Sequence, residues 1–126
     1  MHKIKQFKNK SKAICQKCAI EEFQKNTGKY SRIITPIKGK SIDAINDITI
    51  PLHSLDFLFI DGDHSYESVK QDFLLYSKLL KKGSLLIFHD YACNDVKKVI
   101  SENAMHVVSE SDSLPNLWWG KYNING

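Results

Sequence analysis

The chain has 126 residues, of which 42% are hydrophobic and 25% are charged, and its formal net charge is +4. These proportions are those of a single folded domain, and they exclude an intrinsically disordered chain. There is neither an apolar run long enough to cross a membrane nor a charged-then-apolar leader, so we expect a cytoplasmic protein. The odd number of cysteines, three, also fits a reducing compartment.

The chain opens with a lysine-rich stretch, residues 1–12, that has few apolar side chains. Because it lacks interleaved aromatic residues, we interpret it as a solvated basic segment and do not expect nucleic acid as a partner. Residues 13–26 predict a helix that Gly28 ends. Cys15 and Cys18 have the spacing of half a zinc site, but no second Cys or His pair follows at a suitable distance, so we do not expect zinc.

Residues 32–37 have the β-branched character of a strand, and Gly39 follows them. Ser41 stands directly before residues 42–45, so one interpretation of this serine is the cap of a short helix. Residues 47–51 form a connector.

The centre of the chain has the pattern strand, helix, strand. Residues 55–60 are an almost unbroken apolar run, typical of a strand covered on both faces. From Tyr66 the apolar residues recur at steps of three and four, which predicts an amphipathic helix capped by Ser65 and ended by residues 81–83. Its polar face consists of Glu67, Lys70, Gln71, Asp72, Ser77 and Lys78. Residues 84–88 supply the second strand, so we expect a right-handed βαβ unit with parallel strands.

The remaining pattern closes the sheet. Residues 95–102 predict a short helix, and residues 105–109 and 117–122 predict an antiparallel pair of strands. Trp118 and Trp119 must point to opposite faces of their strand, so one belongs to the core and the other lines a surface or a substrate mouth. The predicted fold is therefore α/β, a Rossmann-like partial parallel sheet of about five strands with helices packed on it and a closing antiparallel pair.

Acidic and histidine residues follow both central strands. The first strand ends in Asp61 to His64 and the second in His89 to Tyr91. Because the carboxyl ends of parallel strands share one edge of a sheet, where open α/β sheets bind ligands, we expect these residues to face one crevice.

DGDHSY at residues 61–66 and HDY at residues 89–91, with the chain between them, resemble the C-terminal half of class I S-adenosylmethionine (SAM) dependent O-methyltransferases. The subgroup is that of macrolide-sugar methyltransferases and cephalosporin-hydroxylase-like proteins. IKGKS at residues 37–41 is similar to that family's loop after its third strand. The family's glycine-rich loop and ribose-binding acid have no counterpart here, so we interpret residues 13–126 as the C-terminal portion of such a domain. A missing N-terminal half, or a second copy of the chain, is therefore an expected partner.

The resemblance implies SAM as the cofactor, with Ser41 near its adenine and Asp61 and Gly62 near its methionine end. It also implies that His64 lies beside the acceptor oxygen, where an imidazole that titrates near neutrality can act as general base. The alternative for His64 is a cap of the helix that follows it.

A metal site is a further hypothesis for the same edge. Metal-dependent relatives hold magnesium with acids at these strand ends, and the candidate ligands here are Asp61, His89 and Asp90. A histidine among them favours a softer ion such as manganese over magnesium. If one ion is bound, the carboxylates of Asp61 and Asp90 should lie within ~5 Å of each other. Without metal, Asp90 would orient His64 or the acceptor.

The function that these residues predict is SAM-dependent methyl transfer to a hydroxyl of a small molecule, such as a sugar or a polyketide. Asp61-x-Asp63 also matches the D-x-D element of nucleotide-sugar glycosyltransferases, which is an alternative. A second alternative is an inactive methyltransferase fragment or an assembly piece.

Overall fold

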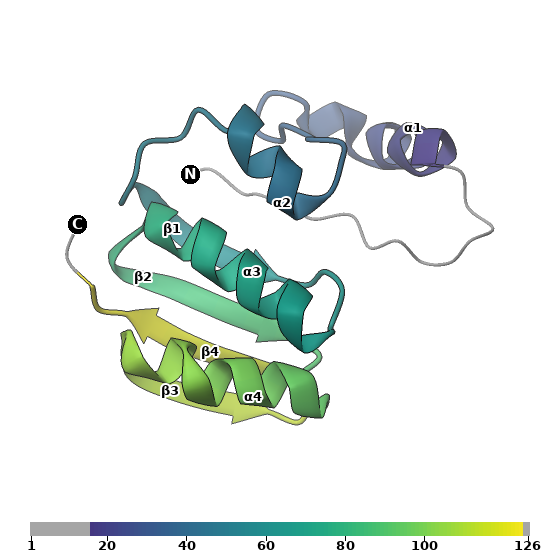
Figure 1. Cartoon of the computed structure of the whole chain (residues 1–126). Helices are drawn as coiled ribbons and strands as arrows, with labels where there is room; N and C mark the ends of the chain where they lie inside the picture. The colour runs from purple at the N-terminus through teal and green to yellow at the C-terminus, as the bar shows by residue number, and fades with distance from the viewer. Residues whose placement is uncertain (1–15, 125–126) are drawn as a thin grey trace.

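The computed structural model describes residues 16–124, so the basic segment, Cys15 and the predicted first turn of the first helix lie outside the described residues. The described elements are α1 (Gln16–Thr27), η1 (Gly28–Tyr30), α2 (Ser41–Ala44), η2 (Ile45–Asp47), β1 (Leu55–Ile60), α3 (Tyr66–Tyr76), η3 (Ser77–Leu79), β2 (Leu80–His89), α4 (Asn94–Glu102), η4 (Ala104–His106), β3 (Val108–Leu114) and β4 (Leu117–Tyr122), where η marks a 3₁₀ turn. Helices α3 and α4 form a layer on one face of the sheet (Figure 1). None of the described helices could span a membrane.

The sheet has four strands in the order β1-β2-β4-β3. β1 and β2 are parallel and are joined through α3, as the sequence predicts. β4 runs antiparallel to β2, and β3 runs antiparallel to β4. The α/β fold with a closing antiparallel pair is thus confirmed, and the carboxyl ends of β1 and β2 lie side by side at one edge.

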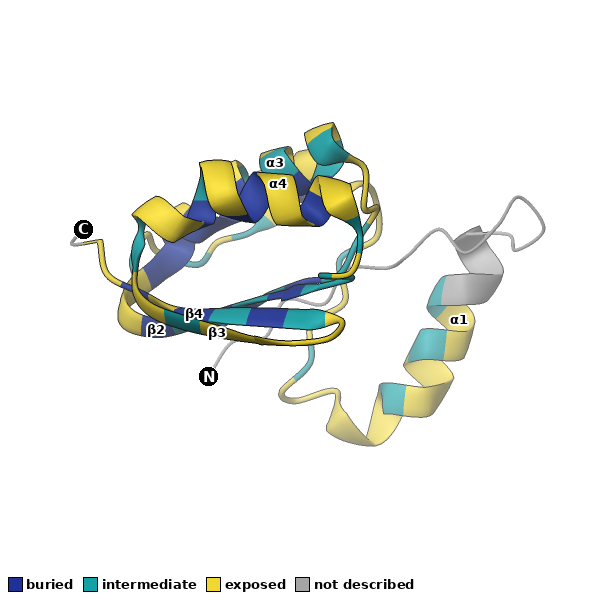
Figure 2. Ribbon diagram, turned by 90° about the horizontal axis from the view of Figure 1, so that it is seen from below, coloured by how far each residue is buried: buried dark blue, intermediate teal, exposed yellow. Residues whose placement is uncertain are grey.

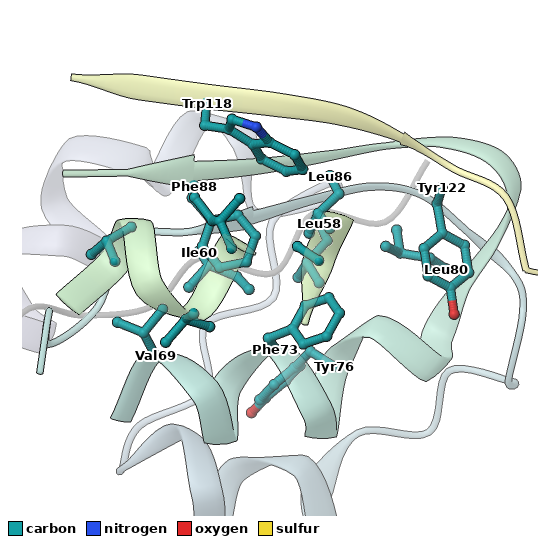
Figure 3. Close-up of a cluster of buried hydrophobic side chains, with 14 of the residues drawn as sticks. Leu58, Ile60, Val69, Phe73, Tyr76, Leu80, Leu86, Phe88, Trp118 and Tyr122 are labelled. Carbon is teal, nitrogen blue, oxygen red and sulfur yellow. The ribbon is translucent and has the colours of Figure 1, made fainter. Parts of the chain in front are cut away.

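The core lies between the sheet and the helix layer. Phe88 on β2 is fully buried, and its ring contacts Trp118 of β4 at 5.7 Å and Phe73 of α3 at 6.1 Å between ring centroids. Figure 3 shows these side chains meeting with Val69 of α3 in one apolar cluster. Close packing of large side chains from three elements fixes the end of β2 relative to α3.

The opposite face of the sheet is only partly buried. Phe57, Phe59, Ile87 and Trp119 all keep an intermediate exposure, whereas α3 and α4 bury the other face (Figure 2). Trp118 is 3% exposed, so the two tryptophans point to opposite faces, as predicted.

Residues 32–37 do not form the predicted strand, and the sheet therefore has four strands instead of about five. The backbone N–H groups of Ile33 and Ile34 both donate to the carbonyl of Tyr30, at 2.9 and 3.0 Å, and so continue the helical turn of η1. β-Branched residues favour a strand only when a neighbouring strand offers its ladder, and here the local turn supplies the partners instead.

The boundaries around α3 also differ from the prediction. α3 ends at Tyr76, and Lys81 to Gly83 belong to β2 and do not end the helix. β2 pairs with β1 at Leu80, and the register then shifts, so these residues extend the strand beyond a bulge. The predicted strand over residues 84–88 is thus longer at both ends.

Three further side chains and one strand depart from expectation. Ser65 makes no side-chain cap for α3, because its hydroxyl donates to Asp63 and the Tyr66 N–H donates to the carboxylate of Asp95 instead. Asp72, predicted on the solvent face of the helix, is 4% exposed, and Ser77 is also buried. β3 begins at Val108 instead of residue 105, because residues 104–106 form a 3₁₀ turn that follows α4.

Candidate active site

A hollow opens at the carboxyl ends of β1 and β2. Its rim consists of Asp61, Gly62, Asp63 and His64 after β1 and of His89 and Asp90 at the end of β2. Its floor consists of core residues from both strands and both helices, namely Ile60, Val69, Phe88 and Val96. The structure therefore brings together all the site residues that the sequence predicts, with the exception of Ser41.

Asp61, His89 and Asp90 converge in this hollow. Nδ1 of His89 lies 3.1 Å from Oδ1 of Asp61 and 3.0 Å from Oδ1 of Asp90. One ligand atom from each residue lies within 4.8 Å of the others, and all three residues are partly buried. The sequence-based limit of ~5 Å for the two carboxylates is thus met.

Backbone conformation helps to aim these side chains. Asp90 has a φ of +59°, in the left-handed region that non-glycine residues seldom adopt, although aspartate tolerates it better than most. The carbonyl of Asp90 accepts the N–H of Cys93 at 2.9 Å, which closes the turn that follows β2. The ring of His89 stands edge-on to Phe59, with 6.2 Å between centroids. Backbone conformations as rare as that of Asp90 are often found at functional sites.

The three donors fit a divalent cation by their chemistry. Nδ1 of His89 is buried, and it makes no hydrogen bond of normal geometry with any described residue, although two carboxylate oxygens lie about 3 Å away. A mixed set of one imidazole nitrogen and carboxylate oxygens suits manganese better than magnesium, which prefers oxygen alone.

Asp63 shapes the loop that carries His64. Its carboxylate accepts the Ser65 N–H at 3.2 Å and the hydroxyls of Ser65 and Ser68 at 3.2 and 3.1 Å. Partial burial acts to raise the pKa of Asp63, but these hydrogen bonds outweigh it and lower the pKa below its ordinary value. Asp63 is thus a turn residue whose side chain bonds to the backbone and hydroxyls that follow it.

His64 is exposed on the rim of the hollow. Its carbonyl oxygen accepts the thiol of Cys93 at 3.6 Å, which links the loop after β1 to the loop after β2. The alternative for His64, a cap of α3, is wrong, because Ser65 occupies the cap position and no side-chain cap bond forms there. The general-base role of His64 stays a prediction, because it depends on a substrate.

Ser41 lies against α3 and is not among the residues that line the hollow. Its hydroxyl donates to Oδ1 of Asp72, and its carbonyl accepts the hydroxyl of Tyr76 at 2.6 Å. The helix-cap interpretation of Ser41 is wrong, because Lys40 occupies the cap position and no side-chain cap bond forms there. The adenine contact stays a prediction.

Sequence reasoning missed the partners of Ser41. Asp72 and Tyr76 are four residues apart on α3 and therefore share one helix face. That face also carries Val69 and Phe73, which are buried, so the spacing contained a signal that Asp72 is buried too. Burial, followed by the nearby Asp72 charge, raises the pKa of Tyr76 to about 12.

Residues 3–91 of the chain match the sequence model of a family described as methyltransferase domain. The chain belongs to this methyltransferase family. The match includes both loops of the hollow up to Tyr91, and it confirms the family that the motifs at residues 61–66 and 89–91 indicate. Membership of the family implies SAM as the methyl donor.

Known relatives are longer than this chain. An uncharacterized protein of Acanthamoeba polyphaga mimivirus, R132, is 44% identical over 77 residues, which are 56% of this chain and 34% of that protein. The solved O-methyltransferase NovP has a TM-score of 0.65 at 15% identity, over 91% of this chain and 55% of its own. A putative caffeoyl-CoA O-methyltransferase from Staphylococcus aureus has a TM-score of 0.58 at 19% identity, over 82% of this chain and 59% of its own. The two solved structures share the fold, and the chain spans about a third to three fifths of these relatives.

Proposed function

We propose that the protein is part of a SAM-dependent O-methyltransferase that transfers a methyl group to a hydroxyl of a small molecule such as a sugar or a polyketide. The observation that carries this proposal is the grouping of Asp61, His64, His89 and Asp90 around one hollow of a methyltransferase-family sheet. Methyl transfer needs an acceptor oxygen that loses its proton as it attacks, and this set offers both a base and a place to hold that oxygen.

The cofactor would lie along the carboxyl edge of the sheet. Asp61 and Gly62 line the hollow and would face the methionine end of SAM, while Ser41 would lie beside the adenine. Because the chain spans only part of its relatives, we expect it to bind SAM more weakly by itself than a full-length relative does. The complementary part of the domain, or a second copy, would then be its partner.

A divalent ion fits the same hollow. Asp61, His89 and Asp90 would hold manganese or magnesium, and the ion would polarise the acceptor hydroxyl. His64 would then take the proton of that hydroxyl, since its exposed side chain borders the same space.

The geometry disfavours the glycosyltransferase alternative. A D-x-D element needs both acids at the ion, but Asp63 directs its two carboxylate oxygens to Ser65 and Ser68. Asp61 instead lies with His89.

Transfer of a labelled methyl group from SAM to a panel of hydroxylated sugars and polyketides tests the proposal, with the chain alone and with a full-length relative for reference. For any acceptor that is methylated, we expect His64→Ala to lower turnover by about 10²- to 10⁴-fold with little change in SAM affinity. His106→Ala, a change of an exposed histidine on η4, is the control. Near-normal turnover by His64→Ala would overturn the role of His64, and a chain that fails to bind SAM would favour the inactive fragment.

A further inference from the structure

Asn116 holds the loop that follows β2 at two consecutive amides. It lies in the turn between β3 and β4, at the same end of the sheet as the carboxyl end of β2, because β4 begins beside the last residue of β2 (Figure 1). The backbone carbonyl of Asn116 accepts the N–H of Tyr91 at 3.4 Å, and its side-chain oxygen Oδ1 accepts the N–H of Ala92 at 3.3 Å. A residue from another turn therefore accepts hydrogen bonds from both amides that directly follow Asp90.

The conformation of Asp90 explains why this loop matters to the site. Successive residues of an extended strand point to opposite faces, so His89 and Asp90 would diverge if β2 continued through Asp90. Asp90 instead has a φ of +59°, and Oδ1 of its carboxylate lies 3.0 Å from Nδ1 of His89. The same imidazole nitrogen lies 3.1 Å from Oδ1 of Asp61. Two neighbouring residues thus reach one site because the chain leaves the extended conformation at Asp90.

Asn116 helps to hold the backbone in this turn. The left-handed region is disfavoured for residues with a Cβ, because that atom approaches the carbonyl oxygen that follows, so the conformation of Asp90 needs support from its surroundings. Of the three N–H groups that follow Asp90, Asn116 accepts the first two, and the carbonyl of Asp90 accepts the third, from Cys93, at 2.9 Å. The bond from Ala92 is the one that depends on a side chain, so a substitution at position 116 can remove it alone.

We propose that Asn116 is a positioning residue of the cation site, which keeps Asp90 in the conformation that lets its carboxylate meet His89 and Asp61. This inference rests on the proposed function, because it takes these three residues to hold a divalent ion. Asn116 is not one of the candidate ligands, and it acts through Asp90. A site that is formed in only a fraction of the molecules binds its ion more weakly in proportion to that fraction. Loss of the bond from Ala92 should therefore lower the affinity for the ion.

Titration of the chain with Mn²⁺ alone tests the inference, with electron paramagnetic resonance to measure the free ion. We expect Asn116→Ala to bind Mn²⁺ about three- to tenfold more weakly than wild type, the range for the loss of one hydrogen bond. Its melting temperature without metal should stay close to that of wild type, because Asn116 and Ala92 are both exposed and an altered loop leaves the buried core intact. Asn116→Asp keeps an acceptor oxygen at this position and should bind Mn²⁺ at least as tightly as wild type.

The charge that Asn116→Asp adds needs its own control. Leu114 lies in the same turn and is 65% exposed, so Leu114→Ala should bind Mn²⁺ as wild type does. The double variant Leu114→Asp with Asn116→Ala adds a carboxylate to this turn without an acceptor at position 116. In about 0.15 M salt, where surface charges are largely screened, it should bind Mn²⁺ as weakly as Asn116→Ala alone.

Wild-type Mn²⁺ affinity in Asn116→Ala would overturn the inference, and so would equal weakening by Leu114→Ala, recovery by the double variant, or failure of Asn116→Asp to bind better than Asn116→Ala. A wild-type chain that binds no Mn²⁺ would overturn it as well, while methyl transfer from labelled SAM would still decide the proposed function. The expected ranking of the variants in a chain that transfers no methyl group would overturn the proposed function and support the role of Asn116.

Discussion

The two faces of the sheet differ although the same strands build them. Leu86 and Phe88 of β2 are fully buried beneath α3 and α4, whereas Ile87 and His89, which alternate with them, keep an intermediate exposure. Successive residues of a strand point to opposite faces, so this contrast lies within four consecutive positions. The helix face supplies most of the buried apolar side chains, whereas Asp61, His89 and Asp90 gather at the edge where β1 and β2 end.

The buried face of the sheet also supports the residues of the candidate active site. Phe88 is packed between Phe73 and Trp118, and it stands directly before His89. This fully buried residue of β2 therefore fixes the backbone from which His89 and Asp90 project. A site whose residues must meet within about 3 Å needs such a support.

The largest difference between the faces should come from Phe88 and Ile87. Phe88→Ala removes a fully buried ring and should lower the free energy of unfolding by about 3–5 kcal/mol. Ile87→Ala, its neighbour on the open face, should cost about 1 kcal/mol, because part of the side chain is already in water. Urea denaturation of both variants measures the two losses in the free energy of unfolding. Equal losses would show that the open face is covered in solution.

Gly120 gives the next largest effect. A Cβ there would lie 2.6 Å from Cη2 of Trp118 and 2.8 Å from Cγ1 of Val108, and the indole is itself packed in the core. Gly120→Ala should therefore cost about 1–3 kcal/mol through overpacking. Gly28→Ala is the control, because no atom outside its own segment lies within 4 Å of the added methyl group. A stable Gly120→Ala variant would mean that Trp118 can shift.

The sequence predicts the strands of the sheet and the helices on it better than it predicts the segments that precede β1. The bounds of β1 and β4 and the parallel pairing of β1 with β2 follow from apolar runs and periodicity. The expectation that residues 55–60 are covered on both faces is wrong, because Phe57 and Phe59 keep an intermediate exposure on the open face. The meeting of Asp61, His89 and Asp90 follows from topology alone, since parallel strands end at one edge.

Other features depend on contacts that no local pattern contains. Residues 32–37 carry strand-forming side chains, but a strand needs a neighbour, and the turn after η1 competes successfully for their backbone. The bond between Ser41 and Asp72 joins residues 31 positions apart. This bond depends on the packing of α2 against α3, and the secondary-structure propensities of single residues do not describe such packing.

Tyr76 allows the link between α2 and α3 to be measured apart from the core. Tyr76→Phe removes one hydroxyl bond and should cost about 1 kcal/mol at neutral pH. The folded state raises the Tyr76 pKa from its ordinary value of 10.0 to about 12, so it favours the neutral phenol. This contribution is complete below pH 10 and is lost as the pH rises from 10 to 12. The advantage of wild type over Tyr76→Phe in urea denaturation should therefore shrink as the pH rises above 10 and should reverse before pH 12, because the rise in the Tyr76 pKa is worth more than the ~1 kcal/mol of the bond. A constant difference would contradict the assignment.

The smallest expected effect is at the loop that carries His64. Asp63→Ala removes the acceptor of the Ser65 N–H and of the Ser65 and Ser68 hydroxyls, and because Asp63 is exposed it should cost only about 0.5 kcal/mol, the lower end of the range for side-chain bonds at a helix start. Because the folded state lowers the Asp63 pKa below 3.8, the contribution is complete above pH 3.8 and is lost as the pH falls through the folded-state value. Thermal unfolding of both chains between pH 7 and 3 should therefore show a difference in melting temperature that narrows on acidification. A melting-temperature difference that persists at low pH would mean that the charge of Asp63 does not stabilise this loop. The turn that presents His64 would then be held by the packing of the Asp63 side chain.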